Sequence, residues 1–488
     1  MSLEKSTKKS CRSRTCNQQR RSMAALAIVS CFAFVCEEVT GFHTASLGLR
    51  STTTRPLLSS RFSGLKLRST NLCTPSASQH NGLSAGLKSH RNRSPRAKFP
   101  CMSSVDTKAE QTATSDVVGE VGFEGFHSLE YWVGNAKQAA SFFVARFGFE
   151  EVAFRGLETG SRDVVTHVVQ QGAIRFAFSS ALNPDNKEMG AHLQLHGDGV
   201  RDVSFKVKDC RKVYKMAIAN GAVSISEPAE ISDEFGTVVR ATVATYGDTV
   251  HTFIQDSDYS GCYLPGFKAV TETDPLSLIT PSPKLAFIDH VVANQPEMTM
   301  EEVCDWYSSV LGFRRFWSVD DSQVTTEYSS LRSIVMTDPA ETVKLPINEP
   351  APGKRKSQIQ EYVDYYGGPG VQHIALRTHE ILHTVQMLKD RGVKFLKVPD
   401  SYYDDLEVRL ADKGVEVLES LAEIRRLNIL VDFDEGGYLL QIFVQPLQDR
   451  PTVFIEVIQR REFEGFGVGN FKALFEAIER EQEARGNL

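Results

Sequence analysis

Two groups of residues in this sequence have types and spacings that suit metal chemistry. The first is the pentapeptide HEILH, in which His379 and His383 stand four residues apart with Glu380 between them. On a helix this spacing is the zinc-protease signature, with both histidines as ligands and the glutamate as general base. However, the chain shows no third ligand that fits a zinc-protease pattern.

The surroundings of HEILH predict an exposed helix face. Three apolar residues, Ile381, Val385 and Leu388, form one stripe when the segment is projected as a helix. His379 and His383 then project from the opposite side. Thr378, which follows the apolar strand VQHIAL, is the expected N-cap of this helix. We therefore expect an outer helix whose histidines form at best an adventitious metal site.

The second group emerges from an internal repeat. Residues 126–152 and 288–319 share the order strand, loop, amphipathic helix, Gly-Phe turn and strand. Residues 196–225 and 367–396 share a Gly-rich turn, a strand, a helix, a glycine and a second strand. The two halves are therefore homologous. Aligning them pairs three positions across the halves: Ser128 with His290, Asp202 with His373, and Thr252 with Glu456.

Only the second half offers a metal ligand at each of the three aligned positions. Two imidazoles and one carboxylate on three strands make a facial triad, which suits Fe(II) and leaves adjacent positions open. Zinc prefers four closed ligands or a single open position. Any one of these histidines by itself would be read as a hydrogen-bonded histidine of a sheet. Three coincidences at equivalent positions favour a metal site.

The repeat also predicts the fold. Repeated βαβββ units that curl a mixed sheet around a pocket resemble the vicinal-oxygen-chelate architecture. We predict an α+β chain of two homologous vicinal-oxygen-chelate domains, each of paired βαβββ modules, with a C-terminal lid helix. The predicted parts are a leader (1–115), a first domain with no metal site (122–272), a linker with three prolines (273–284) and a catalytic domain (285–488).

Charge and cysteines separate the leader from the body. Residues 1–100 carry 17 Lys and Arg against 3 acidic residues, and the other 388 carry 38 against 58. An acidic body argues against nucleic acid as a partner. Six of the nine cysteines lie in the leader and the other three are scattered, which indicates a reducing compartment for the mature protein.

The leader itself has the features of a targeting segment. A basic run precedes the apolar residues 23–36, and an Arg- and Ser-rich, acid-poor stretch follows. This order resembles the two-part presequence that directs proteins to complex plastids. We expect a plastid location, with the cytoplasm as the alternative, and no membrane segment in the mature form.

Ordered strings along the body resemble the 4-hydroxyphenylpyruvate dioxygenase family, from about residue 122 to the C-terminus. They include YWVGNAKQAASF, RGLETGSRDVVTHVVQQG, FIDHVVAN, LPINEP, GGPGVQHIAL, LLQIFVQPLQDRPTVFIEVIQR and GFGVGNFKALFEAIEREQ. The resemblance implies an Fe(II) enzyme that converts 4-hydroxyphenylpyruvate and O₂ to homogentisate and CO₂. That reaction serves tyrosine catabolism and the supply of plastoquinone and tocopherol precursors. A homodimer is also expected.

The resemblance implies roles for individual residues. His290, His373 and Glu456 match the family's iron ligands. The side chains that match its ring-hydroxyl contacts are Ser333, Asn348 and Gln358. Two glutamines, Gln372 and Gln441, match amides near the keto acid and iron. The aromatic residues that match its pocket wall are Phe443, Phe454, Phe466 and Phe471.

Two other functions stay open at this point. Hydroxymandelate synthase resembles the family in fold, triad and substrate but oxidises the side chain instead of the ring. A non-catalytic binding module on the same repeat would have lost the triad in both halves. The connection between Glu456 and the lid helix is short, whereas some plastid members of the family have a longer insertion, so the expected location rests on the leader alone.

Overall fold

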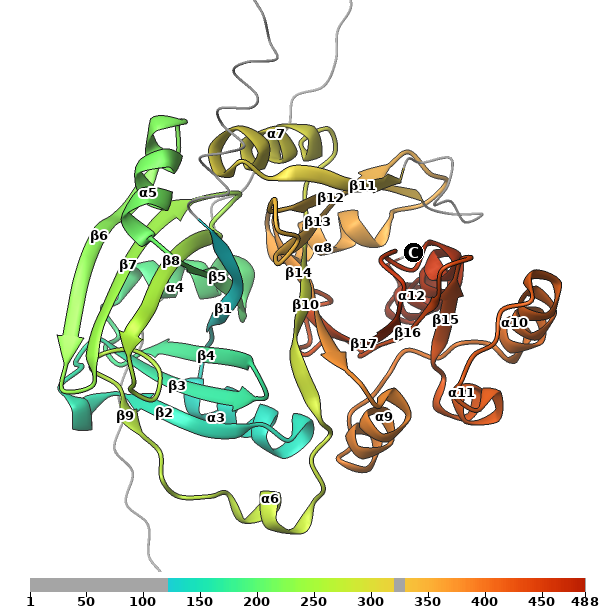
Figure 1. Cartoon of the computed structure of the whole chain (residues 1–488), viewed down its shortest axis with the longest axis horizontal. Helices are drawn as coiled ribbons and strands as arrows, with labels where there is room; N and C mark the ends of the chain where they lie inside the picture. Colours follow the sequence, from blue (N-terminus) through green and yellow to red (C-terminus); the bar gives the residue numbers. More distant parts are fainter. Residues whose placement is uncertain (1–121, 320–329, 488) are drawn as a thin grey trace, which may run out of the picture. The chain divides into compact units, whose positions relative to one another are not determined.

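The computed structural model describes residues 122–319 and 330–487 of the chain. Their strands form two curled mixed sheets (Figure 1). The leader predicted for residues 1–115, with its presequence and six cysteines, lies outside the described residues.

The first sheet comes from residues 123–269. Its strands are β1 (Phe123–Trp132), β2 (Glu150–Arg155), β3 (Val164–Gln171), β4 (Ile174–Ala181), β5 (Gly199–Val207), β6 (Ser224–Asp233), β7 (Gly236–Ala244), β8 (Val250–Tyr259) and β9 (Lys268–Ala269). The helices of this half are α3 (Ala136–Phe142), which continues as the π-turn η1 (Phe143–Phe147), η2 (Leu157–Thr159), α4 (Lys187–His196) and α5 (Cys210–Ala219).

The second sheet comes from residues 285–461. Its strands are β10 (Leu285–Asn294), β11 (Arg314–Val319), β12 (Ser330–Thr337), β13 (Lys344–Ala351), β14 (Gly370–Thr378), β15 (Leu430–Phe433), β16 (Tyr438–Phe443) and β17 (Phe454–Arg461). Its helices are α7 (Met300–Leu311), α8 (Gln358–Tyr366), α9 (Ile381–Asp390), α10 (Asp400–Lys413), α11 (Leu421–Leu427) and α12 (Val468–Arg485).

Each sheet is built from two βαβββ units placed back to back. The strand orders are β6-β7-β8-β5-β1-β4-β3-β2-β9 and β11-β12-β13-β10-β14-β17-β16-β15. In every unit the first strand runs parallel to the last: β1 to β4, β5 to β8, β10 to β13 and β14 to β17. The first strands of paired units are antiparallel. The α+β fold with paired units in both halves is therefore confirmed.

The two Gly-Phe turns end equivalent helices. Gly148 closes η1 at φ +69° and Gly312 closes α7 at φ +68°. This left-handed conformation costs little only for glycine, which explains the residue at both turns. The following residues, Phe149 and Phe313, are buried in the core.

Strand register supports the alignment of the halves. Asp202 pairs with Glu130, and His373 pairs with Val292. These two partners are equivalent, because each stands two residues after the aligned Ser128 or His290. Across the parallel neighbour, Asp202 pairs with Val250 and His373 with Phe454. Thr252 and Glu456 each stand two residues further along those strands, so they too occupy equivalent positions.

The predicted start of the HEILH helix is wrong. Thr378 is the last residue of β14, where it still pairs with Leu285, and α9 begins only at Ile381 with Glu380 at its N-cap. Strand pairing holds Thr378 extended, although its hydroxyl accepts the Glu380 N–H at 3.1 Å. His379 is exposed, as expected.

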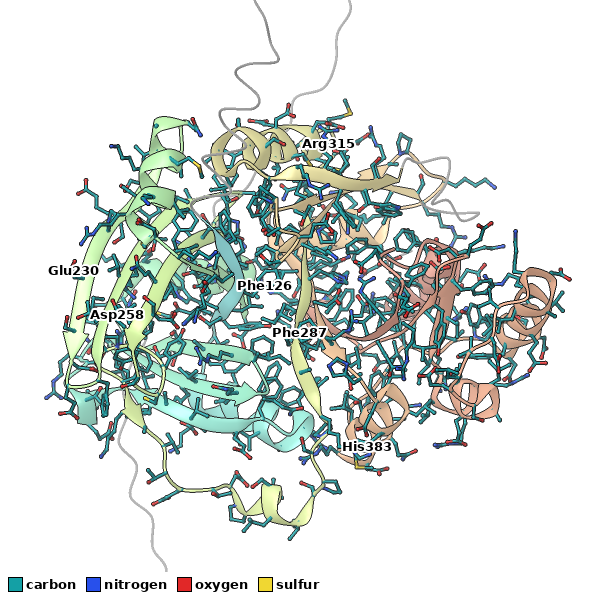
Figure 2. The ribbon with its side chains drawn as sticks, viewed as in Figure 1. Phe126, Glu230, Asp258, Phe287, Arg315 and His383 are labelled. Atoms are coloured by element: carbon teal, nitrogen blue, oxygen red, sulfur yellow. The ribbon has the colours of Figure 1, made fainter. Side chains whose placement is uncertain are left out.

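The rest of that motif behaves as an outer helix. Ile381, Val385 and Leu388 are buried, which confirms the apolar stripe. His383 is half-buried on α9 (Figure 2) and contacts the Ser282 carbonyl at 3.0 Å. Neither histidine of HEILH belongs to a group of potential metal ligands within the described part of the chain.

Some elements were not predicted. A short helix, α6 (Pro275–Ile279), lies within the segment predicted as a linker. The second strand expected at the end of 367–396 is wrong: Phe395 makes an isolated bridge to Val444, and the next strand of this unit is β15. Two helices, α10 and α11, separate α9 from β15, so the chain returns to the sheet later than the repeat predicts. No helix within residues 122–319 and 330–487 is long and apolar enough to cross a bilayer.

Candidate metal centre

Three adjacent strands of the second sheet bring the predicted ligands together. Ala375 in the middle of β14 pairs with His290 on β10 and with Glu456 on β17. These positions form a row across the sheet. His373 precedes Ala375 by two residues and so shares its face, because side chains alternate along a strand. The three side chains form one of the two groups of potential metal ligands among the described residues.

The side-chain atoms of these residues converge on one point. Glu456 Oε2 lies 3.4 Å from His290 Nε2 and 3.3 Å from His373 Nε2. The Nδ1 of His290 donates to the Asp289 carboxylate at 2.8 Å, and the Nδ1 of His373 donates to the Gln372 amide oxygen at 2.9 Å. Each ring therefore presents its Nε2 to the carboxylate. Two nitrogens and one carboxylate oxygen face the same point, so the donor set fits a metal ion.

Burial disfavours the ionised form of Glu456 unless neighbouring groups compensate its charge. All three side chains are buried, and Glu456 is 2% exposed. Burial by itself raises the pKa of Glu456, but the hydrogen bonds and charges of His290 and His373 outweigh it and lower the pKa to about 2. The carboxylate is therefore ionised at neutral pH and available as a ligand.

A pocket of about 580 Å³ opens over the three ligands. All twelve residues predicted for the site line it: His290, His373, Glu456, Ser333, Asn348, Gln358, Gln372, Gln441, Phe443, Phe454, Phe466 and Phe471. Seven apolar residues of the wall were not named as site residues: Val292, Trp317, Leu331, Val335, Pro346, Leu474 and Phe475. Four of them stand two residues from a predicted site residue on the same strand, so period-two alternation could have found them.

Aromatic rings pack directly against the ligands. Phe454 stacks on His373 with ring centroids 4.9 Å apart. Phe466 meets His290 edge-on at 5.2 Å, and Trp317 lies 5.9 Å from Phe466. These rings restrict the orientation of both imidazoles and exclude water from them. Phe471, on α12, contributes to the same wall.

Two amides present polar atoms to the pocket. Gln441 is 1% exposed, and its Nε2 has no hydrogen-bond partner among the described residues. An unpaired buried donor is costly, so this group suits a ligand oxygen. Asn348 donates to Asn294 Oδ1 at 3.4 Å. Among the described residues of the pocket wall none is Lys, Arg or Asp, and Glu456 is the one carboxylate.

Behind His290 lies a buried ionic network. Asp289 accepts from His290 Nδ1 and from Arg460 Nη2, each at 2.8–2.9 Å, and from Arg377 at 2.9 Å. Arg460 also donates to the carbonyls of Phe463 and Gly465 and lies 5.2 Å over the Phe466 ring. The network therefore joins the orientation of His290 to the loop that leads into α12.

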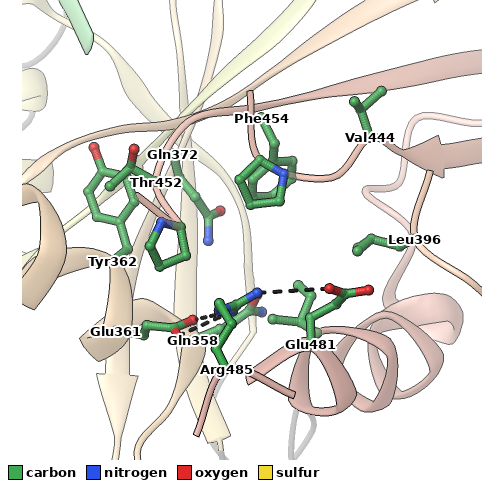
Figure 3. Close-up of a pocket in the computed structure, with 13 residues that line it drawn as sticks. Gln358, Glu361, Tyr362, Gln372, Leu396, Val444, Thr452, Phe454, Glu481 and Arg485 are labelled. Carbon is green, nitrogen blue, oxygen red and sulfur yellow. Dashed lines mark hydrogen bonds and ion pairs between the residues drawn. The ribbon is translucent and has the colours of Figure 1, made fainter. Parts of the chain in front are cut away.

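A smaller hollow adjoins the metal pocket (Figure 3). It shares Gln358, Gln372 and Phe454 with that pocket, so these three side chains form the partition between the two spaces. On the other side Arg485 of α12 pairs with Glu361 of α8 at 3.0 Å. This ion pair ties the end of α12 to α8.

The equivalent place in the first half is occupied by protein groups. The Thr252 hydroxyl donates to Asp202 at 2.5 Å. Ser128 Oγ and the Tyr263 hydroxyl share a hydrogen bond of 2.9 Å. Tyr263 and Leu264, from the segment after β8, pack with Val168 and Ala177 of the sheet. The three aligned positions of this half are therefore engaged with one another or with Tyr263.

Comparisons with known proteins assign each half separately. The family model described as "Hydroxyphenylpyruvate dioxygenase, HPPD, N-terminal" matches residues 118–260. The model of the glyoxalase, bleomycin resistance protein and dioxygenase superfamily matches residues 287–442.

Relatives that match over almost their whole length carry the same family name as the first of these models. The chain is 57% identical over 367 residues to 4-hydroxyphenylpyruvate dioxygenase of Xenopus tropicalis, which covers 75% of this chain and 93% of the relative. Identity to the protein of the same name from Dictyostelium discoideum is 54% over 366 residues, and this match covers 75% of this chain and 100% of the relative. The solved structure of a triple mutant of 4-hydroxymandelate synthase from Streptomyces coelicolor superposes with a TM-score of 0.64 at 29% identity. The superposition covers 73% of this chain and 98% of the synthase. The chain belongs to the 4-hydroxyphenylpyruvate dioxygenase family.

Proposed function

We propose that this chain is an Fe(II)-dependent dioxygenase that converts 4-hydroxyphenylpyruvate and O₂ to homogentisate and CO₂. The observation that carries the proposal is the buried group of His290, His373 and Glu456 at the base of an aromatic pocket. The relatives named above support the substrate. Two nitrogens and one carboxylate oxygen are the donor set that non-haem Fe(II) oxygenases use.

His290, His373 and Glu456 would hold the iron, which would supply the oxidation chemistry. The pocket supports binding of the keto acid beside that ion. A substrate carboxylate finds no Lys or Arg among the described residues of the wall, so we expect the metal ion to compensate its charge. The unpaired amide of Gln441 is suited to hold an oxygen of the keto acid.

The phenol end of the substrate needs neutral partners. We assign Ser333, Asn348 and Gln358 to the ring hydroxyl, because they line the same pocket and carry no charge. Gln372, which accepts from His373, orients that ligand and lies beside the keto acid. The rings of Phe443, Phe454, Phe466 and Phe471 wall the pocket and exclude water, which strengthens the polar contacts inside it.

Hydroxymandelate formation is the second candidate, favoured by the solved structure of a synthase with the same fold. Both reactions would consume the same substrate and O₂, so only the product separates them. A non-catalytic binding module would consume no O₂.

The test is anaerobic reconstitution with Fe(II), followed by addition of O₂ and 4-hydroxyphenylpyruvate. We expect O₂ uptake, with homogentisate as the product on chromatography. Hydroxymandelate as product would establish the second candidate, and absence of O₂ uptake by iron-loaded protein would establish a binding module.

Ligand variants test the role of the triad. We expect His290→Ala, His373→Ala and Glu456→Ala each to abolish turnover and to weaken iron retention after desalting. His383→Ala is the matched control, because this histidine lies on the outer helix α9. Full activity in any triad variant would refute the assignment of that residue.

A further inference from the structure

A second group of potential metal ligands lies in the first half, away from the aligned triad positions. It comprises His192 and His196 of α4 and Asp248, in the turn between β7 and β8. Ligand atoms of the three residues lie within 4.8 Å of one another. The first half was expected to hold no metal site, and this group is built from residues that the repeat did not point to.

His192 has no polar partner in the described part of the chain although it is buried. It is 5% exposed, and neither of its ring nitrogens makes a hydrogen bond to a described residue. Burial lowers the pKa of His192 to about 4, so the ring is neutral and one nitrogen offers a lone pair. A buried polar group without a partner is rare and costly, which points to a bound species.

His196 has the orientation of a metal ligand. Its Nδ1 lies 2.6 Å from the carbonyl oxygen of Tyr366, which can only accept, so Nδ1 carries the hydrogen. Its Nε2 lies 2.9 Å from Asp248 Oδ2. Metal-bound histidines commonly donate their other N–H to a backbone carbonyl in this way.

His196 and His192 stand four residues apart on α4, so they lie on one face of the helix. Their ring centroids are 4.7 Å apart. Around a zinc ion neighbouring ligand atoms are about 3.3 Å apart, given bonds of about 2.0–2.1 Å. His196 Nε2 and Asp248 Oδ2, at 2.9 Å, are already close to that spacing, and the ligand atom of His192 lies within 4.8 Å of both residues. The Asp248 carboxylate is 59% exposed and so can adjust its position.

Some charged groups around the site favour a bound cation and one opposes it. Arg201 opposes a cation, but its guanidinium lies over the Trp132 ring at 4.8 Å and 3.7 Å from Glu188. The acidic groups here are Asp248 and Glu188. A divalent ion would meet two neutral imidazoles and one carboxylate.

We propose that His192, His196 and Asp248 bind a divalent transition-metal ion of the zinc class, with water completing its coordination. Two nitrogens and one oxygen are suitable ligands for such an ion. The ion would join α4 to the β7–β8 turn. Because His196 also bonds to Tyr366 at the end of α8, it would stabilise the contact between the two halves.

The test counts metal ions in the full chain after loading with Zn(II) and desalting. We expect two zinc ions per chain in the wild type and one in Asp248→Asn, whose exposed turn position leaves folding intact. In a background without the triad, His290→Ala with Glu456→Ala, we expect one ion. Adding His192→Ala to that background should remove it. His379→Ala, at an exposed histidine, is the matched control and should change nothing.

Cobalt provides an independent readout. In the triad-free background, Co(II) should give visible absorption bands of a low-coordinate histidine site, and Asp248→Asn should weaken Co(II) binding at least tenfold. Equal metal counts in wild type and Asp248→Asn would overturn the proposal. His196 and Asp248 would then share a hydrogen bond and not a metal ion. Oxygen uptake by iron-loaded Asp248→Asn should stay within about twofold of the wild type, which separates this proposal from the dioxygenase assignment.

Discussion

At the scale of single residues, Asp289 decides how His290 faces the metal pocket. It accepts the Nδ1 hydrogen of His290 and is held by Arg460 and Arg377. Burial alone would raise the pKa of Asp289, but the His290 and Arg460 hydrogen bonds outweigh it and hold that pKa well below its usual value. A carboxylate that orients a ligand histidine typically contributes tenfold or more to metal affinity.

We therefore expect Asp289→Asn to weaken Fe(II) affinity by about 10–100-fold. The measurement is an anaerobic Fe(II) titration of the variant and the wild type. Asp338→Asn is the matched control, because Asp338 is also buried but accepts from backbone N–H groups of its own turn, those of Ala340 at 3.0 Å and Val343 at 2.7 Å. Unchanged affinity in Asp289→Asn would show that the neighbouring rings suffice to orient His290.

Asp202, the counterpart of His373, makes stability depend on pH. Burial raises the pKa of Asp202 to about 7, although Thr252 donates to it. In the unfolded chain this carboxyl has a pKa of about 3.9. Between these values the folded state holds the proton and the unfolded state does not, so stability falls as pH rises through this window. Above pH 7 both states are ionised and the loss is constant.

We expect Asp202→Asn to reduce this loss of stability between pH 5 and pH 8. The pKa difference corresponds to an upper bound of about 4 kcal/mol. The measurement is the unfolding midpoint of variant and wild type at pH 5, 6, 7 and 8. Parallel pH profiles would contradict a raised pKa for Asp202.

At the scale of elements, the start of α12 controls one wall of the metal pocket. Gly467 stands at the N-cap of α12 with φ +77°, and a Cβ there would lie 2.5 Å from the Gln441 amide. The other end of the helix has Gly486 with φ +73° and open space around it. The two positions therefore share backbone strain but differ in contact with the pocket.

Gly467→Ala is expected to lower kcat/KM for 4-hydroxyphenylpyruvate by about tenfold, because it displaces Gln441. Gly486→Ala is the matched control and should leave kcat/KM unchanged. Each variant should lose about 1–2 kcal/mol of stability from the left-handed backbone. Steady-state kinetics and denaturant unfolding measure the two effects, and equal kinetic losses in both variants would exclude a specific role for the contact with Gln441.

The elements also show where sequence patterns fail. The repeats predicted the first strand and the helix of each unit and the two Gly-Phe turns, because alternation and glycine are local signals. The strand expected at the end of 367–396 was wrong. The repeats missed α10 and α11, which belong to one unit only, so comparison of the halves could not find them. Thr378 has the chemistry of an N-cap, but its pairing with Leu285 on β10 keeps it in the strand.

At the scale of the whole molecule, buried polar contacts join the two halves. His251 Nδ1 donates to the Val203 carbonyl at 2.9 Å, which leaves Nε2 to accept from the Tyr307 hydroxyl at 2.7 Å. Leu285 N–H donates to Gln171 at 2.7 Å, and Gln448 spans from the second half to Asp198. The buried apolar core is also continuous, with Phe123 and Phe313 rings 5.1 Å apart.

Tyr307→Phe should therefore destabilise the protein by about 1–3 kcal/mol, because it leaves the buried His251 Nε2 without a donor. We expect residues 122–488 to unfold in a single transition with a lower midpoint, measured by circular dichroism during denaturant titration. Tyr365→Phe is the control at an exposed tyrosine and should change the free energy of unfolding by less than about 0.5 kcal/mol. Equal midpoints would show that the His251 contact does not contribute to stability.

The sequence by itself determined the repeat, the fold class and the positions of His290, His373 and Glu456, because duplication and strand periodicity are written along the chain. It also excluded HEILH as a catalytic site through the absence of a third ligand. Only the tertiary structure decided what lies beside those positions. Examples are the contact of Arg460 with Asp289 behind His290, the unpaired Nε2 of Gln441, and the meeting of Asp248 with the two histidines of α4. They depend on the packing of segments far apart in sequence. No local pattern encodes such contacts, since strand register and packing across the sheets bring them about.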